Sequence, residues 1–265
     1  MELPRTAAIA ANLEILDSAG STNDELVAAA AGLPDLAVVV TDNQTKGRGR
    51  LGREWVAPAG SAVAVSVLVR PRLPAGEPLE LAHFGWLPLI AGLAMTRAVA
   101  SLVPQGEQRV GLKWPNDVQV DGLKVCGILA ELLPTADGVV IGAGLNLAMT
   151  REQLPVETAT SLALSGAQPE GLADAAVSAY LAGFTALVRE FVSLGGDPVG
   201  SGIHDQLTEA CTTIGSEVRV QLPGAADLRG TATGVDLSGR LVVRRSSDGR
   251  SQAVAAGDVT HVRYE

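Results

Sequence analysis

The sequence has few cysteines, few aromatic residues and no long apolar run. Its two cysteines, Cys126 and Cys211, are too few for a disulfide framework and lack the spacing of metal ligands. We therefore expect both as reduced thiols that pack like small hydrophobic groups. Neither a stretch long enough to cross a bilayer nor a charged and then apolar leader is evident. These absences favour a cytoplasmic protein without a membrane partner.

Positive charge is also scarce. The formal net charge is −9 and the isoelectric point is near 4.9, which argues against a general nucleic-acid-binding surface. Of the 20 basic residues only three are lysines, Lys46, Lys113 and Lys124. A chain of 265 residues is long enough to bury one substantial core and to carry a smaller second domain.

Against this acidic background, residues 45–55, TKGRGRLGREW, concentrate four cations and three glycines. Glycine leaves backbone N–H groups accessible, and fixed cations suit an anionic ligand such as a phosphate or a carboxylate. An exposed basic turn or a nucleic-acid contact would have the same composition. All three lysines and two of the three tryptophans, Trp55 and Trp114, fall in this segment or in residues 113–131.

The order of helical and extended patterns predicts an α+β protein. Helices are expected from residue 21 and over residues 83–102 and 171–194. Strands are expected over residues 36–42, 61–71, 109–120, 123–132 and 138–147. From residue 214 onwards, short alternating strands with closely spaced turns are typical of a small β-barrel.

Asp121-Gly122 is a strong two-residue hairpin signal between two of these strands. The resulting register makes Asp117 and Lys124 diagonal neighbours on one polar face. Such a face could equally belong to a solvated surface. The expected pairs are Val120 with Leu123, Gln119 with Lys124, Val118 with Val125 and Asp117 with Cys126.

Four motifs, in this order and spacing, resemble those of the biotin protein ligases: GRGRLGREW (47–55), KWPND (113–117), LKVCGILAE (123–131) and GAGLN (142–146). STN at residues 21–23 and Gln44 fit the same pattern. The resemblance covers residues 15–150 with specific motifs and the C-terminal part more loosely.

The resemblance implies two domains. Residues 1–213 would form the catalytic domain, a mixed sheet flanked by helices that is similar to the core of class II aminoacyl-tRNA synthetases. Residues 214–265 would form an SH3-like barrel. About 20 residues precede the STN motif, too few for the N-terminal winged helix-turn-helix of some relatives, so we expect the single-function form without DNA binding.

The activity implied by the resemblance is that of an ATP-dependent ligase. It would join biotin to ATP, giving biotinyl-5′-adenylate and pyrophosphate, and then pass biotin to a lysine of a biotin carboxyl carrier domain in a biotin-dependent carboxylase. ATP would act with Mg²⁺, and the enzyme would be a monomer or a weak homodimer. Because the reacting groups are anions, the site needs fixed cations and donors where charge accumulates.

On the biotin side, the resemblance assigns polar side chains to the two N–H groups and the carbonyl of the ureido ring: Ser21, Thr22, Asn23 and Gln44. A helix cap and a strand-end polar group are their alternative roles. The biotin carboxylate and the adenylate would contact Arg48, Gly49, Arg50 and Lys124. Lys124 and Arg48 are the expected catalytic groups, with Lys124 as the bridge between the carboxylate and the α-phosphate.

On the nucleotide side, Arg53 would lie near the phosphates and Trp55 would pack near the adenylate. Asn146 would lie close to the adenine or the ribose, whereas the glycines of its motif could be no more than a close strand contact. The nucleotide and a magnesium ion near Asp117 would be organised by Lys113, Asn116 and Asp117.

The glycines of the basic segment would let it close over the ligand, which protects an acyl-adenylate from water. Without a bound anion the arginines between Gly47 and Arg53 repel one another. The segment is then expected to be poorly ordered or held away from the pocket.

Two other functions remain open. A lipoate-protein ligase of the related fold uses the same two-step chemistry, but a dithiolane needs little hydrogen bonding, so the motifs fit biotin better. A non-catalytic sensor of biotin or a nucleotide could use the same pocket. Which of biotin and lipoate is consumed distinguishes a biotin ligase from a lipoate ligase. Release of pyrophosphate distinguishes a ligase from a sensor.

Overall fold

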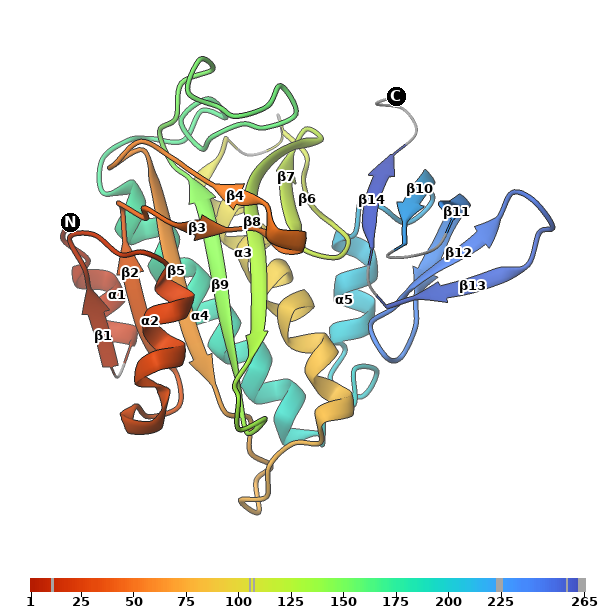
Figure 1. Ribbon diagram of the computed structural model, residues 1–265, viewed down its shortest axis with the longest axis horizontal. Helices are drawn as coiled ribbons and strands as arrows, with labels where there is room; N and C mark the ends of the chain where they lie inside the picture. Colours follow the sequence, from red (N-terminus) through yellow and green to blue (C-terminus); the bar gives the residue numbers. More distant parts are fainter. Residues whose placement is uncertain (11, 105, 107, 223–225, 256, 262–265) are drawn as a thin grey trace.

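The computed structural model describes residues 1–10, 12–104, 106, 108–222, 226–255 and 257–261. A seven-stranded sheet in the order β1-β2-β5-β9-β8-β7-β6 runs through the larger part of the molecule (Figure 1). β1 and β2 are parallel and the other neighbours are antiparallel, so the sheet is mixed. Its strands are β1 (Asn12–Ile15), β2 (Ala37–Thr41), β5 (Ala62–Val69), β6 (Val110–Lys113), β7 (Asp117–Val120), β8 (Leu123–Leu132) and β9 (Val139–Asn146).

Helices cover one face of this sheet (Figure 1). α3 lies against β6 to β9, α4 packs on α3, and the short helices α1 and α5 lie beside α4 and α3. Val63, Val65 and Val67 of β5 point into this core, as the period-two pattern of the strand requires. The helices are α1 (Pro4–Ile9), α3 (Leu87–Leu102), α4 (Leu172–Ser193) and α5 (Ile203–Ala210).

The opposite face of the sheet is covered in part by α2 (Thr22–Ala29). Leu26 of this helix is fully buried against Leu68 of β5 and its neighbours. Further along the same face, β9 presents Gly142 and Gly144 in place of the apolar side chains that it turns towards α3. Glycines leave this part of the face open for side chains from other segments.

A five-stranded antiparallel sheet follows in the order β13-β12-β11-β10-β14 (Figure 1). Two buried indoles attach it to the larger part: Nε1 of Trp86 donates to the Leu237 carbonyl at 2.9 Å, and Nε1 of Trp114 to the Gly239 carbonyl at 3.1 Å. Its strands are β10 (Glu217–Gln221), β11 (Leu228–Val235), β12 (Leu241–Arg245), β13 (Ser251–Val254) and β14 (Asp258–His261).

The predicted fold class, a mixed sheet flanked by helices and followed by a small β-domain, is confirmed. Two elements differ in extent. The helix expected from residue 83 begins as α3 only after a 3₁₀ segment, η3 (Leu81–Trp86), and Pro88 sits in its first turn, where no N–H is needed. Residues 109–120 form two strands, β6 and β7, rather than one extended piece. The domain division between residues 213 and 214 stays a prediction.

The expectation that no segment could span a membrane needs correction. Leu81–Leu102 and Leu172–Ser193 are long and apolar enough by length and composition. Within their most apolar windows 67% and 56% of the residues are buried in the fold. Packing within the fold therefore accounts for their apolar character.

Candidate functional site

Glycines on β9 make room for the side chains that the motifs singled out. A Cβ on Gly142 would lie 2.3 Å from Oδ1 of Asn23, and a Cβ on Gly144 would lie 3.0 Å from the ring of Trp55. Asn23 and Trp55 therefore lie directly on the strand. These glycines do more than allow a close strand contact, because a larger residue at either position would displace Asn23 or Trp55, which are predicted to contact the ligand.

A hydrogen-bonded group of side chains lies at the start of α2. Ser21 is the N-cap of this helix, and its hydroxyl accepts a bond from the backbone N–H of Asp24. Oε1 of Gln44 accepts from the backbone N–H of Thr22 at 2.9 Å and lies 3.2 Å from its hydroxyl oxygen. Ser21, Thr22 and Asn23 are each at most 4% exposed. The structure thus brings the four residues predicted for the ureido ring together, with Ser21 also serving as a cap.

The basic segment forms a small ribbon across this face. β3 (Gly47–Arg48) pairs with β4 (Glu54–Trp55) (Figure 1). Arg48 forms ion pairs with Asp24 and, at 3.1 Å, with Glu131 of β8. These carboxylates supply negative charge to Arg48 and hold it on this face, whereas the expectation that the segment is poorly ordered or held away without a bound anion stays a prediction.

Arg50 joins three parts of the molecule. Its Nη1 donates to Oδ1 of Asn116 at 2.9 Å, and its Nη2 donates to the carbonyl of Gly257, just before β14, at 3.1 Å. Asn116 is fixed in turn, because its Nδ2 donates to the Ile128 carbonyl at 3.0 Å. Burial lowers the pKa of Arg50, an effect that the nearby Asp117 carboxylate opposes. A planar guanidinium held in this way suits a phosphate.

Lys124 of β8 and Asp117 of β7 form an ion pair with 2.7 Å between Nζ and Oδ1. The predicted diagonal contact is therefore confirmed. Gly127 makes room for it, since a Cβ there would lie 3.0 Å from Nζ of Lys124. The side chains of Lys124 and Asp117 are 42% and 22% exposed, so both are accessible to a ligand.

The predicted register of this hairpin is half wrong. A β-bulge, with Val125 as the extra residue, shifts the pairing beyond Gln119. Cys126 consequently points into the core, and burial raises the pKa of its thiol to about 12. Both cysteines are buried free thiols, as predicted. The observed pairs are Val120 with Leu123, Gln119 with Lys124, Val118 with Cys126 and Asp117 with Gly127.

Lys113 pairs with Asp117 across β6 and β7 and so adds a second lysine to this cluster. Burial lowers the pKa of Lys113; Asp117 opposes this shift, and the nearby Lys124 and Arg53 cations add to it. Three cations, Lys113, Lys124 and Arg50, thus lie near the Asp117 carboxylate. The surplus of positive charge would favour an anionic ligand.

Two further motif residues lie at the margins of the site. Asn146, at the end of β9, is buried and its Nδ2 donates to the Thr160 carbonyl at 2.9 Å. This contact ties it to the segment after β9 rather than to the Lys113 cluster. Trp114 turns its indole to the C-terminal sheet, so this tryptophan of the KWPND motif has a structural role.

Sequence reasoning missed Asp24, Ser66 and Glu131. Ser66 is the one polar residue of β5, AVAVSVLV, and such a break in an apolar strand is a usable signal. Glu131 ends the LKVCGILAE motif and shares a face with Gly127. Asp24 follows STN directly, but nothing in the sequence pairs it with Arg48.

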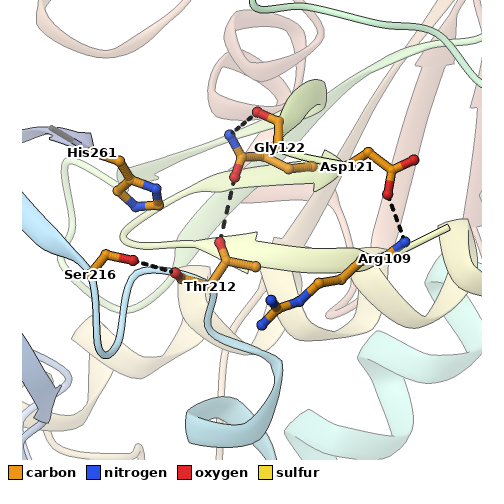
Figure 2. Close-up of a pocket in the computed structure, with 7 residues that line it drawn as sticks. Arg109, Asp121, Gly122, Thr212, Ser216 and His261 are labelled. Carbon is orange, nitrogen blue, oxygen red and sulfur yellow. Dashed lines mark hydrogen bonds between the residues drawn. The ribbon is translucent and has the colours of Figure 1, made fainter. Parts of the chain in front are cut away.

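A cavity of about 300 Å³ lies elsewhere, beside the β7–β8 turn and the start of the C-terminal sheet (Figure 2). Its polar groups bond to one another: Oδ1 of Asp121 accepts from the backbone N–H of Arg109 at 2.9 Å, and the Ser216 hydroxyl donates to the Thr212 carbonyl at 3.1 Å (Figure 2). Its described lining includes no predicted site residue. Nor do the described residues contain a group of three or more His, Cys, Asp or Glu placed to hold a metal.

Comparison with known proteins gives two family matches and several relatives. Residues 18–146 match the Biotin/lipoate A/B protein ligase family, and residues 213–262 match the Biotin protein ligase C terminal domain. The sequence is 37% identical to the biotin--[acetyl-CoA-carboxylase] ligase of Mycobacterium tuberculosis, with 95% of this chain and 89% of that protein covered. It is 32% identical to the ligase of the same name from Paracoccus denitrificans, with 90% and 96% covered.

A solved structure extends the match to the fold. The biotin protein ligase from Aquifex aeolicus, in complex with biotin and ATP, aligns with a TM-score of 0.72 at 26% identity and covers 94% of this chain and 98% of that one. The sequence relatives and the fold align along nearly the whole chain, and the two family models match residues 18–146 and 213–262 within it. This protein therefore belongs to the biotin protein ligase family.

Proposed function

We propose that this protein activates biotin with ATP to biotinyl-5′-adenylate and transfers the biotinyl group to a lysine of a carrier domain. The observation that carries the proposal is the way the basic segment links two clusters. Arg48 reaches the buried polar group around Asn23 through Glu131, and Arg50 reaches the Lys124–Asp117 cluster through Asn116. A ligand with a polar ring at one end and phosphates at the other fits this arrangement.

The polar end of the site fits a ureido ring. Ser21, Thr22, Asn23 and Gln44 supply both donors and acceptors, and the first three are buried. The two N–H groups and the carbonyl of a buried ureido ring need such partners, whereas an apolar dithiolane has no groups that could use them. The polar end of the site therefore favours biotin over lipoate.

In the first step, a carboxylate oxygen of biotin attacks the α-phosphorus of ATP, and the bond to pyrophosphate breaks as the new O–P bond forms. We assign Lys124 to bridge the carboxylate and the α-phosphate and Arg48 to stabilise the same negative charge. Lys124 then leaves its partner Asp117 and binds the ligand. Arg48 likewise leaves its partners Asp24 and Glu131.

Other residues would hold the adenylate. Arg50 and Gly49 belong to the segment that covers the ligand, and Trp55 would pack near the adenylate on Gly144. Asn146 is assigned to the adenine or ribose end. The phosphate contacts are assigned to Arg53, Lys113 and Asn116.

Magnesium that accompanies ATP supplies further positive charge at the phosphates. Such an ion typically binds through one or two carboxylates together with nucleotide phosphates. Asp117 fits this role because it lies in the phosphate-binding cluster and Lys124 turns away from it when the ligand binds. A site completed by the nucleotide requires no protein cage of three ligands.

In the second step, the neutral amine of an acceptor lysine attacks the biotinyl carbonyl, and AMP leaves as the amide bond forms. The named relatives act on acetyl-CoA carboxylase. We propose an acceptor of the same class, the biotin carboxyl carrier domain of a biotin-dependent carboxylase.

Pyrophosphate release with ATP and Mg²⁺ tests the proposal. We expect release that depends on biotin without any acceptor, and a retained species with the mass of biotinyl-adenylate. Equal release with lipoate would favour a lipoate ligase. A protein that binds biotin without releasing pyrophosphate would be a sensor, and the proposed function would fail.

We further propose a cytoplasmic monomer or weak homodimer that binds no specific DNA. The formal net charge of −9 disfavours contact with a phosphate backbone. A salt-resistant mobility shift of a defined DNA duplex would contradict this. Sedimentation velocity tests the oligomeric state, and limited proteolysis tests the division into residues 1–213 and 214–265.

A further inference from the structure

A buried serine orders the amide of Asn23. Oγ of Ser66, which is fully buried on β5, lies 2.6 Å from Oδ1 of Asn23 and 2.7 Å from Oγ1 of Thr22. A carbonyl oxygen can only accept, so the single proton of Ser66 goes to Asn23 and its oxygen accepts from Thr22. Oε1 of Gln44 accepts from the backbone N–H of the same Thr22 at 2.9 Å, so Ser66 is linked directly to Asn23 and Thr22 and through Thr22 to Gln44.

Glu131 holds the opposite end of the same amide. Its Oε2 accepts from Nδ2 of Asn23 at 2.6 Å, and its Oε1 accepts from Nη2 of Arg48 at 3.1 Å. The Leu129 carbonyl accepts more weakly from the same Nδ2, at 3.4 Å. Asn23 therefore faces a donor with its oxygen and acceptors with its nitrogen, while Gly142 lies directly beneath it.

We propose that Ser66 and Glu131 are positioning residues: together they fix the Asn23 amide, and Glu131 couples it to Arg48 of the basic segment. The proposal rests on the proposed function, because it takes Asn23 as a biotin contact. When a ligand binds Arg48 and breaks its contact with Glu131, Glu131 remains bonded only to Asn23 among these two partners. Binding of a ligand at Asn23 and the position of the basic segment are then linked in both directions.

The link requires a carboxylate at position 131. Both oxygens of a carboxylate accept, so Glu131 can serve the amide of Asn23 and the guanidinium of Arg48 at once. A glutamine has one accepting oxygen and one NH₂ group. Whichever way it is turned, its NH₂ group faces a donor from Asn23 or from Arg48, so Glu131→Gln should break one contact and weaken the other.

Three variants distinguish the contacts that join Ser66, Asn23, Glu131 and Arg48. Glu131→Gln should raise the dissociation constant for biotin about fivefold and also speed trypsin cleavage after Arg48 about threefold in the ligand-free protein. Ser66→Ala should raise only the dissociation constant, because the contact between Glu131 and Arg48 remains. Asp24→Asn should speed the cleavage without raising the dissociation constant, because Asp24 contacts Arg48, competes with the ligand for it and makes no side-chain bond to Asn23 among the described residues.

The measurements are calorimetry with biotin and mass analysis of tryptic fragments, with cleavage at the exposed Arg250 as an internal reference for the extent of digestion. Glu25→Gln, which removes an exposed carboxylate next to Asp24, is the matched control. For Glu131→Gln, kcat should change less than the KM for biotin, which distinguishes positioning from chemistry.

The pattern of the three variants decides the outcome. If Glu131→Gln leaves either readout at the wild-type value, the coupling is overturned; if it does not fold, unchanged biotin affinity in Ser66→Ala overturns the positioning of Asn23. Failure of the proposed function looks different, since the wild-type protein would then release no pyrophosphate with biotin. Ligand-free trypsin cleavage would still test the bond between Glu131 and Arg48 in that case.

Discussion

At the scale of single residues, the site depends on what lies beneath and beside each polar group. Asn23 can lie on the sheet because position 142 has no side chain, and Lys124 can reach Asp117 because position 127 has none. A methyl group added at position 142 would contact Oδ1 of Asn23, and one added at position 127 would contact Nζ of Lys124. The identity of a glycine here determines the position of a neighbouring side chain.

Gly142→Ala tests this dependence. The added Cβ would lie 2.3 Å from Oδ1 of Asn23, so the amide must move. We expect a loss of stability of about 1–3 kcal/mol from overpacking and a biotin affinity reduced about tenfold. Gly32→Ala, where a Cβ meets nothing within 4 Å, is the control for thermal unfolding and calorimetry. Equal results for the two variants would contradict the assignment.

Lys124→Ala should impair adenylate formation more than biotin binding. The lysine charge matters most when the carboxylate and the α-phosphate share negative charge, so we expect kcat to fall by about 10²–10³. Pyrophosphate release at saturating substrates measures this, and calorimetry measures binding. Lys46→Ala removes an exposed lysine from the start of the basic segment and serves as the control. Normal turnover with lost biotin binding would show that the assigned role is wrong.

At the scale of secondary-structure elements, one extra residue determines which side chains share a face. The bulge at Val125 lets Lys124 lie on the same face as Gly127, although the two are an odd number of residues apart. Without it, Cys126 would share that face, as the regular hairpin register predicts. The ribbon of β3 and β4 then crosses this face and brings two arginines to it.

Protection of that ribbon by ligands is the prediction at this scale. Trypsin should cut after Arg48, Arg50 and Arg53 most readily in the free protein, less with biotin and least with biotin and ATP. The adenylate spans the whole site and offers a phosphate, whereas biotin offers a single carboxylate, so the adenylate should order the segment more fully. Equal cleavage in the three states would mean that the segment does not cover the ligand.

At the scale of the whole molecule, the C-terminal sheet contacts the larger part through several side chains. The indoles of Trp86 and Trp114 donate to carbonyls of one turn between β11 and β12. Arg50 of the basic segment donates to Gly257 before β14. The smaller sheet thus contacts the segment that covers the site, although its own strands carry no predicted site residue.

Trp114→Phe should destabilise the protein through this attachment. The variant removes the bond to the Gly239 carbonyl and part of a side chain that is 2% exposed, so we expect a loss of about 1–3 kcal/mol. Differential scanning calorimetry should show a lower Tm, by roughly 2–4 °C for each kcal/mol in a chain of this size. Trp55→Phe, at a partly exposed position, should change Tm less. An unchanged Tm for Trp114→Phe would contradict the structural role.

Much of the fold and the membership of the site follow from local signals. The helix cap at Ser21, the alternation of β5 and the turn at Asp121-Gly122 depend on residues that are close in sequence, so the sequence alone predicts them. The motifs likewise identified the residues that cluster on the open face of the sheet. Short elements such as α1 and α5 were missed because their patterns are too brief to distinguish from loops.

Tertiary structure alone decided the partners of the cations and the role of the glycines. Arg48 meets Asp24 and Glu131 across 24 and 83 residues of sequence, and no local pattern encodes a contact at that distance. The bulge at Val125 and the fit of Asn23 on Gly142 depend on how three strands and a helix pack together. The sequence determined which side chains are present at the site, whereas packing determined which atoms face one another, because close approach is a property of the folded chain.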